Sequence, residues 1–246
     1  MRRRLAETDL KPWHQKMWCI PRVDGEFVAR MEDVLDLSAE TPDPKFPVVC
    51  FDESPIQRLG EVRQPIAAEP GRPRRVDDEY RRHGTMTVFV MLDVHRPGRR
   101  VIVSERRTGL EFALCLRDLV DQGYPHAHRI RIVVDNLSTH TPAALYQAFP
   151  APEARRILRR LEFHSTPKHA RWLNMVEIEI GLLKGQCLDR RISAPELLKA
   201  EIAVWERARN SAGAHVRWMF TTNNARTKMG RAYPRPASPN GSVKPS

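Results

Sequence analysis

Short apolar runs of strand length alternate with helical patterns through the middle of this 246-residue chain. Runs rich in β-branched or aromatic residues predict five strands, at 46–51, 85–94, 100–105, 129–134 and 162–165. Apolar residues recur with a helical period at 26–37, 109–122, 142–149, 153–161, 174–187 and 195–209. The turn signal Arg96-Pro97-Gly98 predicts that the second and third strands pair antiparallel. This order of elements predicts an α/β fold with a mixed sheet flanked by helices.

Composition shifts divide the chain into a main domain and its flanks. Residues 1–45 are polar and interrupted by prolines, which predicts a linker with a lead-in helix, and residues 46–213 hold the elements of one main domain. Residues 214–233 are a C-terminal extension, and the proline-rich tail at 234–246 is expected to be disordered. Within the main domain, the Pro-, Gly- and Arg-rich segment 55–84 predicts a basic hairpin or loop.

The chain is strongly basic. Its 41 Lys and Arg against 30 Asp and Glu give a formal charge of +11, which favours a polyanionic partner such as nucleic acid. Cys19, Cys50, Cys115 and Cys187 show neither a CxxC pair nor zinc-ligand spacing, so we expect reduced, buried thiols. The longest apolar run is too short to span a bilayer, so we expect a cytoplasmic protein with no membrane partner.

Three acidic residues stand where metal-dependent phosphodiester chemistry needs them. Asp52 and Asp135 each close a predicted strand, and Glu177 opens a helical pattern that can pack beside the same sheet edge. Carboxylate oxygens suit Mg²⁺ and Mn²⁺, and two such ions can activate a water molecule and stabilise a leaving oxygen. We therefore expect these residues to hold two ions, with Asp52 between them and Asp135 and Glu177 each completing one side.

Other roles for the acidic residues stay open on spacing alone. At 100° per residue, Glu177 and Glu179 lie on nearly opposite sides of their helix, so only one faces the site, and periodicity does not choose between them. An aspartate at a strand end often caps a turn, and we interpret Asp93 in that way. Glu53 is expected to point to the other face of its strand, and Trp172 to be a core anchor.

Three sequence motifs carry a family resemblance. FDES at 51–54, VVDNLSTH at 133–140 and HSTPKHARWLNMVEIEIGLLKGQCL at 164–188 closely resemble the bacterial insertion-sequence transposases of the mariner-related DDE superfamily. The resemblance extends from about residue 5 to 234 and implies a ribonuclease H-like fold with a five-stranded mixed sheet. The family pattern of Thr-Pro, Leu-Asn and then the catalytic Glu falls on Glu177. Glu179 is then a bystander, and its replacement is expected to leave activity intact.

The resemblance also implies a reaction and a partner. In cut-and-paste transposition, metal-dependent hydrolysis exposes a 3′-hydroxyl, which then attacks target DNA in the same site. The implied protein is bacterial, associated with the nucleoid, and acts as a homodimer on double-stranded DNA. Asn136 and His140, just after Asp135, are candidates for the rim of the active site. We expect the following basic side chains to contact DNA: Arg72, Arg74, Arg75, Arg81, Arg82, Lys168 and Lys184.

One departure from the family pattern concerns the N-terminus. Family members usually carry a helix-turn-helix region that reads the inverted repeats of the element, whereas this sequence starts at what resembles the connector behind that region. Two alternatives therefore stay open: a truncated relic that binds DNA without cutting it, and a host nuclease on the ribonuclease H-like fold. Nicking with a divalent metal would exclude the relic, and activity on RNA–DNA hybrids or four-way junctions would favour the host nuclease.

Overall fold

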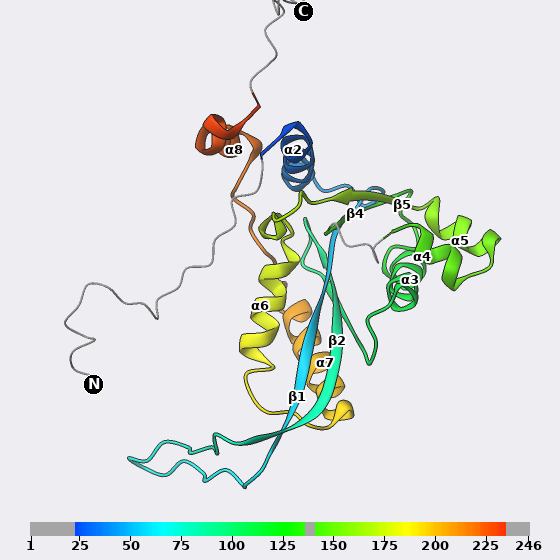
Figure 1. Cartoon of the computed structure of the whole chain (residues 1–246). Coiled ribbons are helices and arrows are strands. Elements are labelled where there is room, and N and C mark those ends of the chain that lie inside the picture. Colours follow the sequence, from blue (N-terminus) through cyan, green and yellow to red (C-terminus); the bar gives the residue numbers. More distant parts are fainter. Residues whose placement is uncertain (1–22, 136–140, 235–246) are drawn as a thin grey trace, which may run out of the picture.

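The computed structural model describes residues 23–135 and 141–234, and a five-stranded mixed sheet lies at its centre (Figure 1). The strands are β1 (Val48–Glu61), β2 (Tyr80–Asp93), β3 (Arg99–Ser104), β4 (Ile130–Val134) and β5 (Leu161–Ser165), in the spatial order β3-β2-β1-β4-β5. The β1–β2 and β2–β3 pairs are antiparallel, whereas the β1–β4 and β4–β5 pairs are parallel. The mixed sheet expected for a ribonuclease H-like domain is therefore confirmed.

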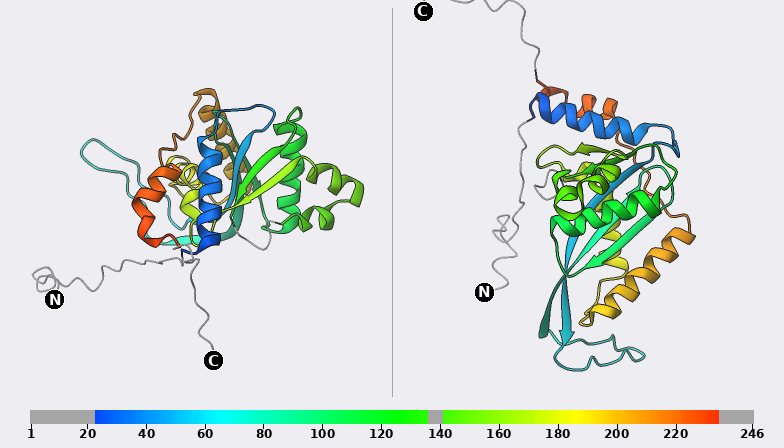
Figure 2. Two further views of the ribbon diagram at one scale, coloured as in Figure 1. Left: turned by 90° about the horizontal axis from the view of Figure 1, so that it is seen from above. Right: turned by 90° about the vertical axis from the view of Figure 1, so that its right-hand side faces the viewer.

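Helices cover both faces of the sheet (Figures 1 and 2). They are α2 (Gly25–Ala39), α3 (Gly109–Asp118) with the π-helical turn η1 (Leu119–Gly123), α4 (Ala143–Ala148), α5 (Ala151–Leu158), the 3₁₀ turn η2 (Arg171–Leu173), α6 (Val176–Gln186), α7 (Pro195–Ser211), α8 (Thr222–Met229) and the 3₁₀ turn η3 (Gly230–Ala232). Every segment with a predicted helical period forms a helix, with ends that differ from the prediction by a few residues.

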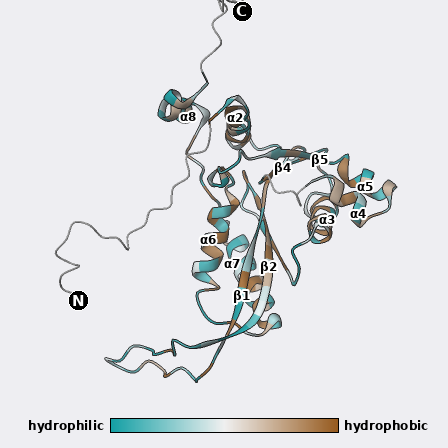
Figure 3. Cartoon of the chain, viewed as in Figure 1, coloured by the Kyte–Doolittle hydropathy of each residue, from teal (hydrophilic) through white to brown (hydrophobic). Residues whose placement is uncertain are grey.

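Side-chain alternation along β1 divides the core into two clusters. Val48 and Cys50 belong to a cluster that also contains residues of α2, α6 and α7, whereas Val49 and Phe51 belong to a cluster formed with α3, α4 and α5. All four side chains are buried. Successive side chains of a strand point to opposite faces, so a central strand covered on both faces becomes a continuous apolar run. Figure 3 shows β1 and β2 as hydrophobic where they lie between the helices.

Strands β1 and β2 continue beyond the sheet as a long two-stranded hairpin (Figure 1). We call the outer part of this hairpin, residues 55–84, the arm. The predicted end of the first strand, just before Asp52, is wrong, because β1 runs on to Glu61 and pairs with β2 as far as Tyr80. Pro55 suggested a break, yet the strand accepts it: the described pairing of β1 with β4 covers only Val48–Cys50, and proline is tolerated at a strand edge. The predicted basic hairpin is confirmed, with more strand and less loop than expected.

Arg191, in the loop between α6 and α7, binds to the base of the arm. Arg191 donates hydrogen bonds to the carboxylate of Glu61 and to the carbonyl oxygen of Glu79, at 2.5 and 2.8 Å. Its guanidinium also lies 5.6 Å from the ring centroid of Tyr80. These contacts join the base of the arm, which Figure 2 shows projecting from the sheet, to the α6–α7 loop.

Segments from both ends of the described chain pack on this domain. Phe27, Met31 and Leu35 of α2 are buried in the cluster that also holds α6 and α7. Helix α8 lies beside α2 (Figure 2), and Arg226 of α8 donates two hydrogen bonds to Glu32 of α2, at 2.7 and 2.8 Å. None of the helices within 23–135 and 141–234 combines the length and the apolar character needed to cross a membrane.

Candidate active site

The parallel pairing of β1 with β4 brings Asp52 beside Asp135. Val48–Cys50 pair in order with Arg131–Val133, so each partner number is higher by 83, and the same difference separates Asp52 from Asp135. Asp135 directly follows the last residue of β4. Neighbouring strands lie about 4.8 Å apart, and Asp52 shares the face of Cys50, on which α6 packs. Both aspartates are buried, with exposures of 1% and 7%.

Glu177 lies in the first turn of α6 and approaches Asp52 from there. The side-chain amide of Asn174 donates a buried hydrogen bond of 2.9 Å to the carbonyl oxygen of Phe51, the residue before Asp52. The backbone N–H of Glu177 in turn donates to the carbonyl oxygen of Asn174, at 3.0 Å. Asn174 therefore links the start of α6 to β1 and determines where Glu177 lies relative to Asp52.

Arg171 contacts two of the three carboxylates at once. Its Nε lies 2.8 Å from Oε1 of Glu177, and its Nη2 lies 3.4 Å from Oδ2 of Asp52. Arg171 is not among the site residues predicted from the sequence. The available signal was a cation six residues before Glu177 in the same motif. A single guanidinium therefore joins Asp52 to Glu177.

Asp52 has an unusual acidity. Burial raises the pKa of its carboxyl to about 7, and the negative charges of Asp135 and Glu177 act in the same direction. The backbone N–H of Glu53, which donates to Oδ1 of Asp52 at 2.8 Å, and the Arg171 guanidinium oppose this rise in pKa. Asp52 therefore lies within electrostatic reach of both Asp135 and Glu177.

Glu179 lies on the other side of α6, in a buried ion-pair cluster. Its side chain is fully buried, and Oε1 lies 2.7 Å from Nε of Arg99 in β3 and 2.7 Å from Nε of Arg209 in α7. Residues two apart on a helix are separated by about 200°, so the burial of Glu179 directs Glu177 away from this cluster. The structure therefore places Glu177, and not Glu179, beside Asp52.

The positions of Asp52, Asp135 and Glu177 agree with the family that the sequence matches. Residues 47–199, well over half of the chain, match the family described as DDE superfamily endonuclease. The chain belongs to the DDE superfamily of endonucleases. No curated protein sequence matches it.

Solved structures of the Mos1 transposase share the fold of this DDE domain. The chain is 18% identical to the Mos1 paired-end complex with the left transposon end, with a TM-score of 0.52, covering 86% of this chain and 65% of that one. For the Mos1 mariner paired-end complex with Mn, the identity is 17% and the TM-score 0.52, and the match covers 94% of this chain and 68% of that one. For a pre-cleavage Mos1 transpososome, the identity is 17% and the TM-score 0.55, and the match covers 94% of this chain and 69% of that one. The chain thus spans about two thirds of the Mos1 chain, and at these identities the likeness shows the fold alone.

The acidic residues of the DDE domain do not form a closed metal cage by themselves. Within the described ranges, no three His, Cys, Asp or Glu side chains converge at metal-binding distance. The expected cage of three carboxylates is therefore not preformed in this part of the chain. The Arg171 guanidinium instead lies between Asp52 and Glu177.

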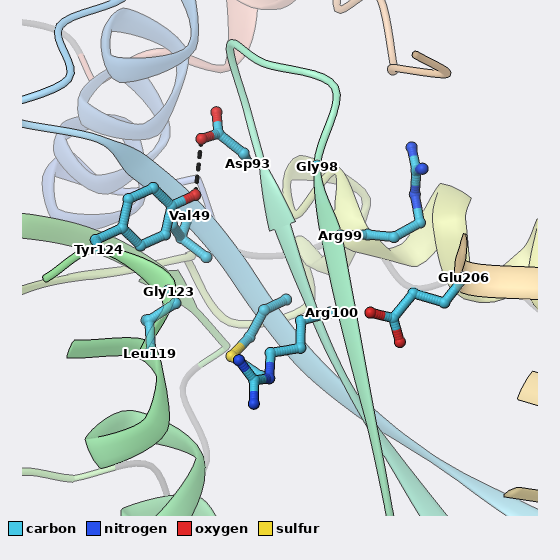
Figure 4. A pocket seen from close by; sticks show the side chains of 10 residues that line it. Val49, Asp93, Gly98, Arg99, Arg100, Leu119, Gly123, Tyr124 and Glu206 are labelled. Atoms are coloured by element: carbon cyan, nitrogen blue, oxygen red, sulfur yellow. Dashed lines mark hydrogen bonds between the residues drawn. The ribbon is translucent and has the colours of Figure 1, made fainter. Parts of the chain in front are cut away.

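Two other acidic residues near the sheet have structural roles, as predicted. Glu53 points away from Asp52 and pairs with Arg107, with 2.6 Å between Oε1 and Nη2. Asp93 lines a cavity of about 270 Å³ beside β3 and η1, where its Oδ2 accepts a 2.7 Å hydrogen bond from the Tyr124 hydroxyl (Figure 4). Its Oδ1 accepts from the backbone N–H groups of the next turn, at 2.9 Å. Asp93 is therefore a turn cap.

The basic residues predicted to contact DNA lie on two exposed parts of the DDE domain. Five of them lie on the arm, and two lie on or just before the η2–α6 segment. Their role in DNA binding stays a prediction. Asn136 and His140, the predicted rim residues, lie outside the described residues. The loop of the arm carries Arg72, Arg74 and Arg75, the start of β2 carries Arg81 and Arg82, and Lys168 and Lys184 lie before η2 and on α6.

Trp172 differs from its prediction. Its side chain is 46% exposed, so the expectation of a core anchor is wrong. The η2 turn directs it outward, where it makes an edge-to-face contact with Phe220 at a centroid distance of 5.5 Å. Apolar character alone did not indicate which side of this short turn would be covered.

The cysteine prediction is confirmed for the described residues. Cys50, Cys115 and Cys187 are free and buried, and Cys19 lies outside the described ranges. Burial raises the pKa of the Cys50 and Cys115 thiols to about 12, so neither is an activated nucleophile.

Replacing Asn174 is expected to cost both stability and activity. Asn174→Ala removes the hydrogen bond to Phe51, which should lower the free energy of unfolding by about 1–3 kcal/mol. It also frees the start of α6, and a displacement of Glu177 by about 1 Å can reduce catalysis roughly a hundredfold. Urea unfolding and Mn²⁺-dependent DNA nicking measure the two effects.

A helix cap outside the acidic cluster provides the matched control for Asn174. Asn224 of α8 forms a capping box with Thr221, and Asn224→Ala should cost about 0.5–2 kcal/mol without reducing nicking. Nicking by folded Asn174→Ala at the wild-type rate would show that the hydrogen bond does not position Glu177.

Proposed function

We propose that this DDE domain is the catalytic domain of a bacterial insertion-sequence transposase, which cleaves DNA at the element ends and transfers the exposed 3′-hydroxyl to target DNA. The observation that carries the proposal is that Asp52 is near Asp135, in the neighbouring strand, and near Glu177, across the Arg171 guanidinium. Strand register sets the two aspartates side by side, and one guanidinium joins Asp52 to Glu177. Membership of the DDE superfamily supports the same chemistry.

The acidic cluster fits a divalent metal. Burial and two neighbouring carboxylates raise the pKa of Asp52 to about 7, and a divalent cation is a counter-charge suited to such a cluster. Asp52, Asp135 and Glu177 would hold two such ions. Bound Mg²⁺ or Mn²⁺ would supply an activated water and stabilise the leaving oxygen. One of the similar Mos1 structures is described as a complex with Mn, in keeping with this proposal.

The chain itself orients the carboxylates for this role. Asp52 comes from a central strand, and the backbone N–H of Glu53 holds its Oδ1, which leaves Oδ2 directed toward Arg171. Glu177 is held through Asn174 on one side of α6 and through the ion pairs of Glu179 on the other. Side chains on rigid elements need little reorganisation during the reaction, which favours catalysis.

The proposed partner is double-stranded DNA, both at the element ends and at the target. A formal charge of +11 and the exposed arginines of the arm favour a phosphate backbone. The similar Mos1 structures are described as paired-end complexes, in keeping with a homodimer on DNA. We further propose that the protein acts in the bacterial cytoplasm, in association with the nucleoid.

A nicking assay tests this function against its alternatives. The purified chain is incubated with supercoiled plasmid and Mn²⁺, Mg²⁺ or EDTA. Nicking is expected in the presence of either metal ion and not in the presence of EDTA. DNA binding without nicking would favour a non-catalytic relic. Preferred cleavage of RNA–DNA hybrids or four-way junctions would favour a host nuclease.

The arm arginines are expected to contribute to the salt dependence of DNA binding. Replacing Arg72, Arg74 and Arg75 together with glutamine should reduce the slope of log affinity against log salt by about 3, because each phosphate contact contributes about 0.9. Fluorescence anisotropy with a labelled duplex at several salt concentrations measures this slope. Arg207→Gln on α7, exposed and remote from the arm, is the control, and equal slopes for all three proteins would exclude the arm as a phosphate contact.

A further inference from the structure

Arg171 lies between Asp52 and Glu177, although it comes from a short turn and not from the sheet. It is the first residue of η2, and its guanidinium lies 2.8 Å from Glu177 and 3.4 Å from Asp52. The exposed fractions of the three side chains differ strongly: 62% for Arg171, 32% for Glu177 and 2% for Asp52. The cation therefore approaches the carboxylates from the solvent side.

The guanidinium supplies the positive charge that this cluster needs. Partial burial alone would lower the pKa of Arg171, but the charges of Asp52 and Glu177 outweigh this effect and raise it. The same contact opposes the rise in the pKa of Asp52. Arg171 thus acts on the carboxylates in the same direction as a metal ion, with one unit of charge instead of two.

The position of Arg171 is one that a metal ion must share or take. A metal bound between Asp52 and Glu177 needs the carboxylate oxygens that now face the guanidinium, Oδ2 and Oε1. A cation beside a bound divalent ion is also repelled by it. A metal ion bound there and the Arg171 guanidinium therefore compete for the same carboxylate oxygens.

The Arg171 side chain can leave without a change in the fold. Its backbone is held within the turn, where its carbonyl oxygen accepts a 2.8 Å hydrogen bond from the N–H of Asn174. The side chain has a flexible stem and lies mostly in solvent, so a rotation about its own bonds is sufficient. The neighbouring side chains of the core need not move.

We propose that Arg171 is a positioning residue that occupies the place between Asp52 and Glu177 in the metal-free protein and is displaced when a divalent ion binds. This inference rests on the proposed function, because it concerns the same carboxylates. Arg171 holds the two side chains near each other against their mutual repulsion. In return, it lowers the affinity of the site for the metal.

Metal affinity distinguishes this role from a merely structural one. Arg171→Ala removes the competing cation, so Mn²⁺ should bind up to about fivefold more tightly than to the wild type, the size expected when a mostly exposed ion pair no longer has to be broken. Arg171→Lys keeps the charge but lacks the planar fork that contacts both carboxylates, so its affinity should lie between the two. A residue that only supported the fold would leave affinity unchanged or weaken it on removal.

The experiment measures Mn²⁺ binding to the full chain by electron paramagnetic resonance of the free ion. Thermal unfolding without metal is the second readout, and Arg171→Ala should unfold at a lower temperature than wild type because its carboxylates lose their counter-charge. Arg207→Ala, an exposed arginine on α7 without an ion pair among the described residues, should match wild type in both measurements. Arg171→Gln, which keeps part of the stem, repeats the test should the alanine variant fail to fold.

The possible outcomes separate this inference from the proposed function. Tighter Mn²⁺ binding by Arg171→Ala supports the inference. Equal or weaker binding by that variant, with a wild type that binds Mn²⁺, overturns the role of Arg171 and leaves the proposed function standing. If wild type binds Mn²⁺ no better than Glu177→Gln does, the metal site and the proposed function fail together.

Discussion

Replacing Asp52 with asparagine is expected to abolish Mn²⁺-dependent nicking while leaving the fold intact. Asp52→Asn keeps the size and shape of the side chain but removes the charge that would hold the metal ions. The loss of a group that stabilises charge in the transition state typically costs about 100- to 1,000-fold in rate, so nicking should fall by at least about a hundredfold. Nicking of supercoiled plasmid at saturating Mn²⁺ measures the effect.

The same variant should be more stable than wild type when no metal is present. Burial raises the pKa of Asp52 from 3.8 to about 7, so the folded protein binds this proton more tightly than the unfolded chain. The ionised carboxylate therefore increasingly destabilises the fold as the pH rises from 3.8 to about 7. Above that range, Asp52→Asn should add up to about 4 kcal/mol to the free energy of unfolding, because one pKa unit corresponds to about 1.4 kcal/mol. Thermal unfolding in EDTA at pH 5 and pH 8 measures this gain, which should be larger at pH 8.

Asp135→Asn and Glu177→Gln should lose nicking to a similar extent, because each supplies a carboxylate to the same cluster. Glu53→Gln is the matched control: Glu53 neighbours Asp52 in β1 and is buried, but it faces Arg107 on the other side of the strand. Its nicking rate should stay within about threefold of wild type, since its side chain points to the opposite face of β1 from Asp52. Persistence of metal-dependent nicking in any of the three site variants would contradict the assignment.

Glu179→Ala is expected to have the largest effect on stability. It leaves Arg99, fully buried, and Arg209, largely buried, without their shared carboxylate. Burial already lowers the pKa of Arg99, and Glu179 opposes that change. Breaking a buried ion pair from one side costs about 3–5 kcal/mol, which for a chain of this size corresponds to a fall in Tm of roughly 10 °C. Differential scanning calorimetry measures this fall.

An exposed pair on α7 provides the control for this prediction. Glu196 pairs with Lys199 at 3.1 Å, and its side chain is 83% exposed, so Glu196→Ala should change stability by less than about 1 kcal/mol. Below its lowered Tm, the folded fraction of Glu179→Ala should still nick DNA, because Glu177 is unchanged. Two variants with the same Tm would show that the buried cluster contributes little.

The elements of the fold were largely predictable from local patterns. The apolar runs predicted β2, β3, β4 and β5 with ends within about five residues of those observed, and the helical periods predicted α2, α3 and α7 in the same way. The extent of β1 was not predictable, because Pro55 is acceptable only where the strand has an edge, and the edge depends on the length of β4. Pairing partners lie outside any local window.

For the candidate site, too, local patterns predicted some features, and others depend on the tertiary structure. Asp52 and Asp135 were identifiable because each follows an apolar run, and the family motif distinguished Glu177 from Glu179. The burial of Glu179 with Arg99 and Arg209 joins three elements that are distant in sequence, so no spacing rule indicates it. Trp172 was misjudged for the same reason, because its exposure depends on how η2 lies against the C-terminal segment.

The sequence by itself determined which acidic residues are available, the period of each element and the positive charge that suits DNA. Only the tertiary structure decided that Asp52 meets Asp135 through strand register, that Asn174 fixes the start of α6, and that Arg171 enters between two carboxylates. The physical reason is that local patterns follow from the covalent spacing of neighbours. Burial, pKa and charge pairing depend on which distant side chains exclude water together.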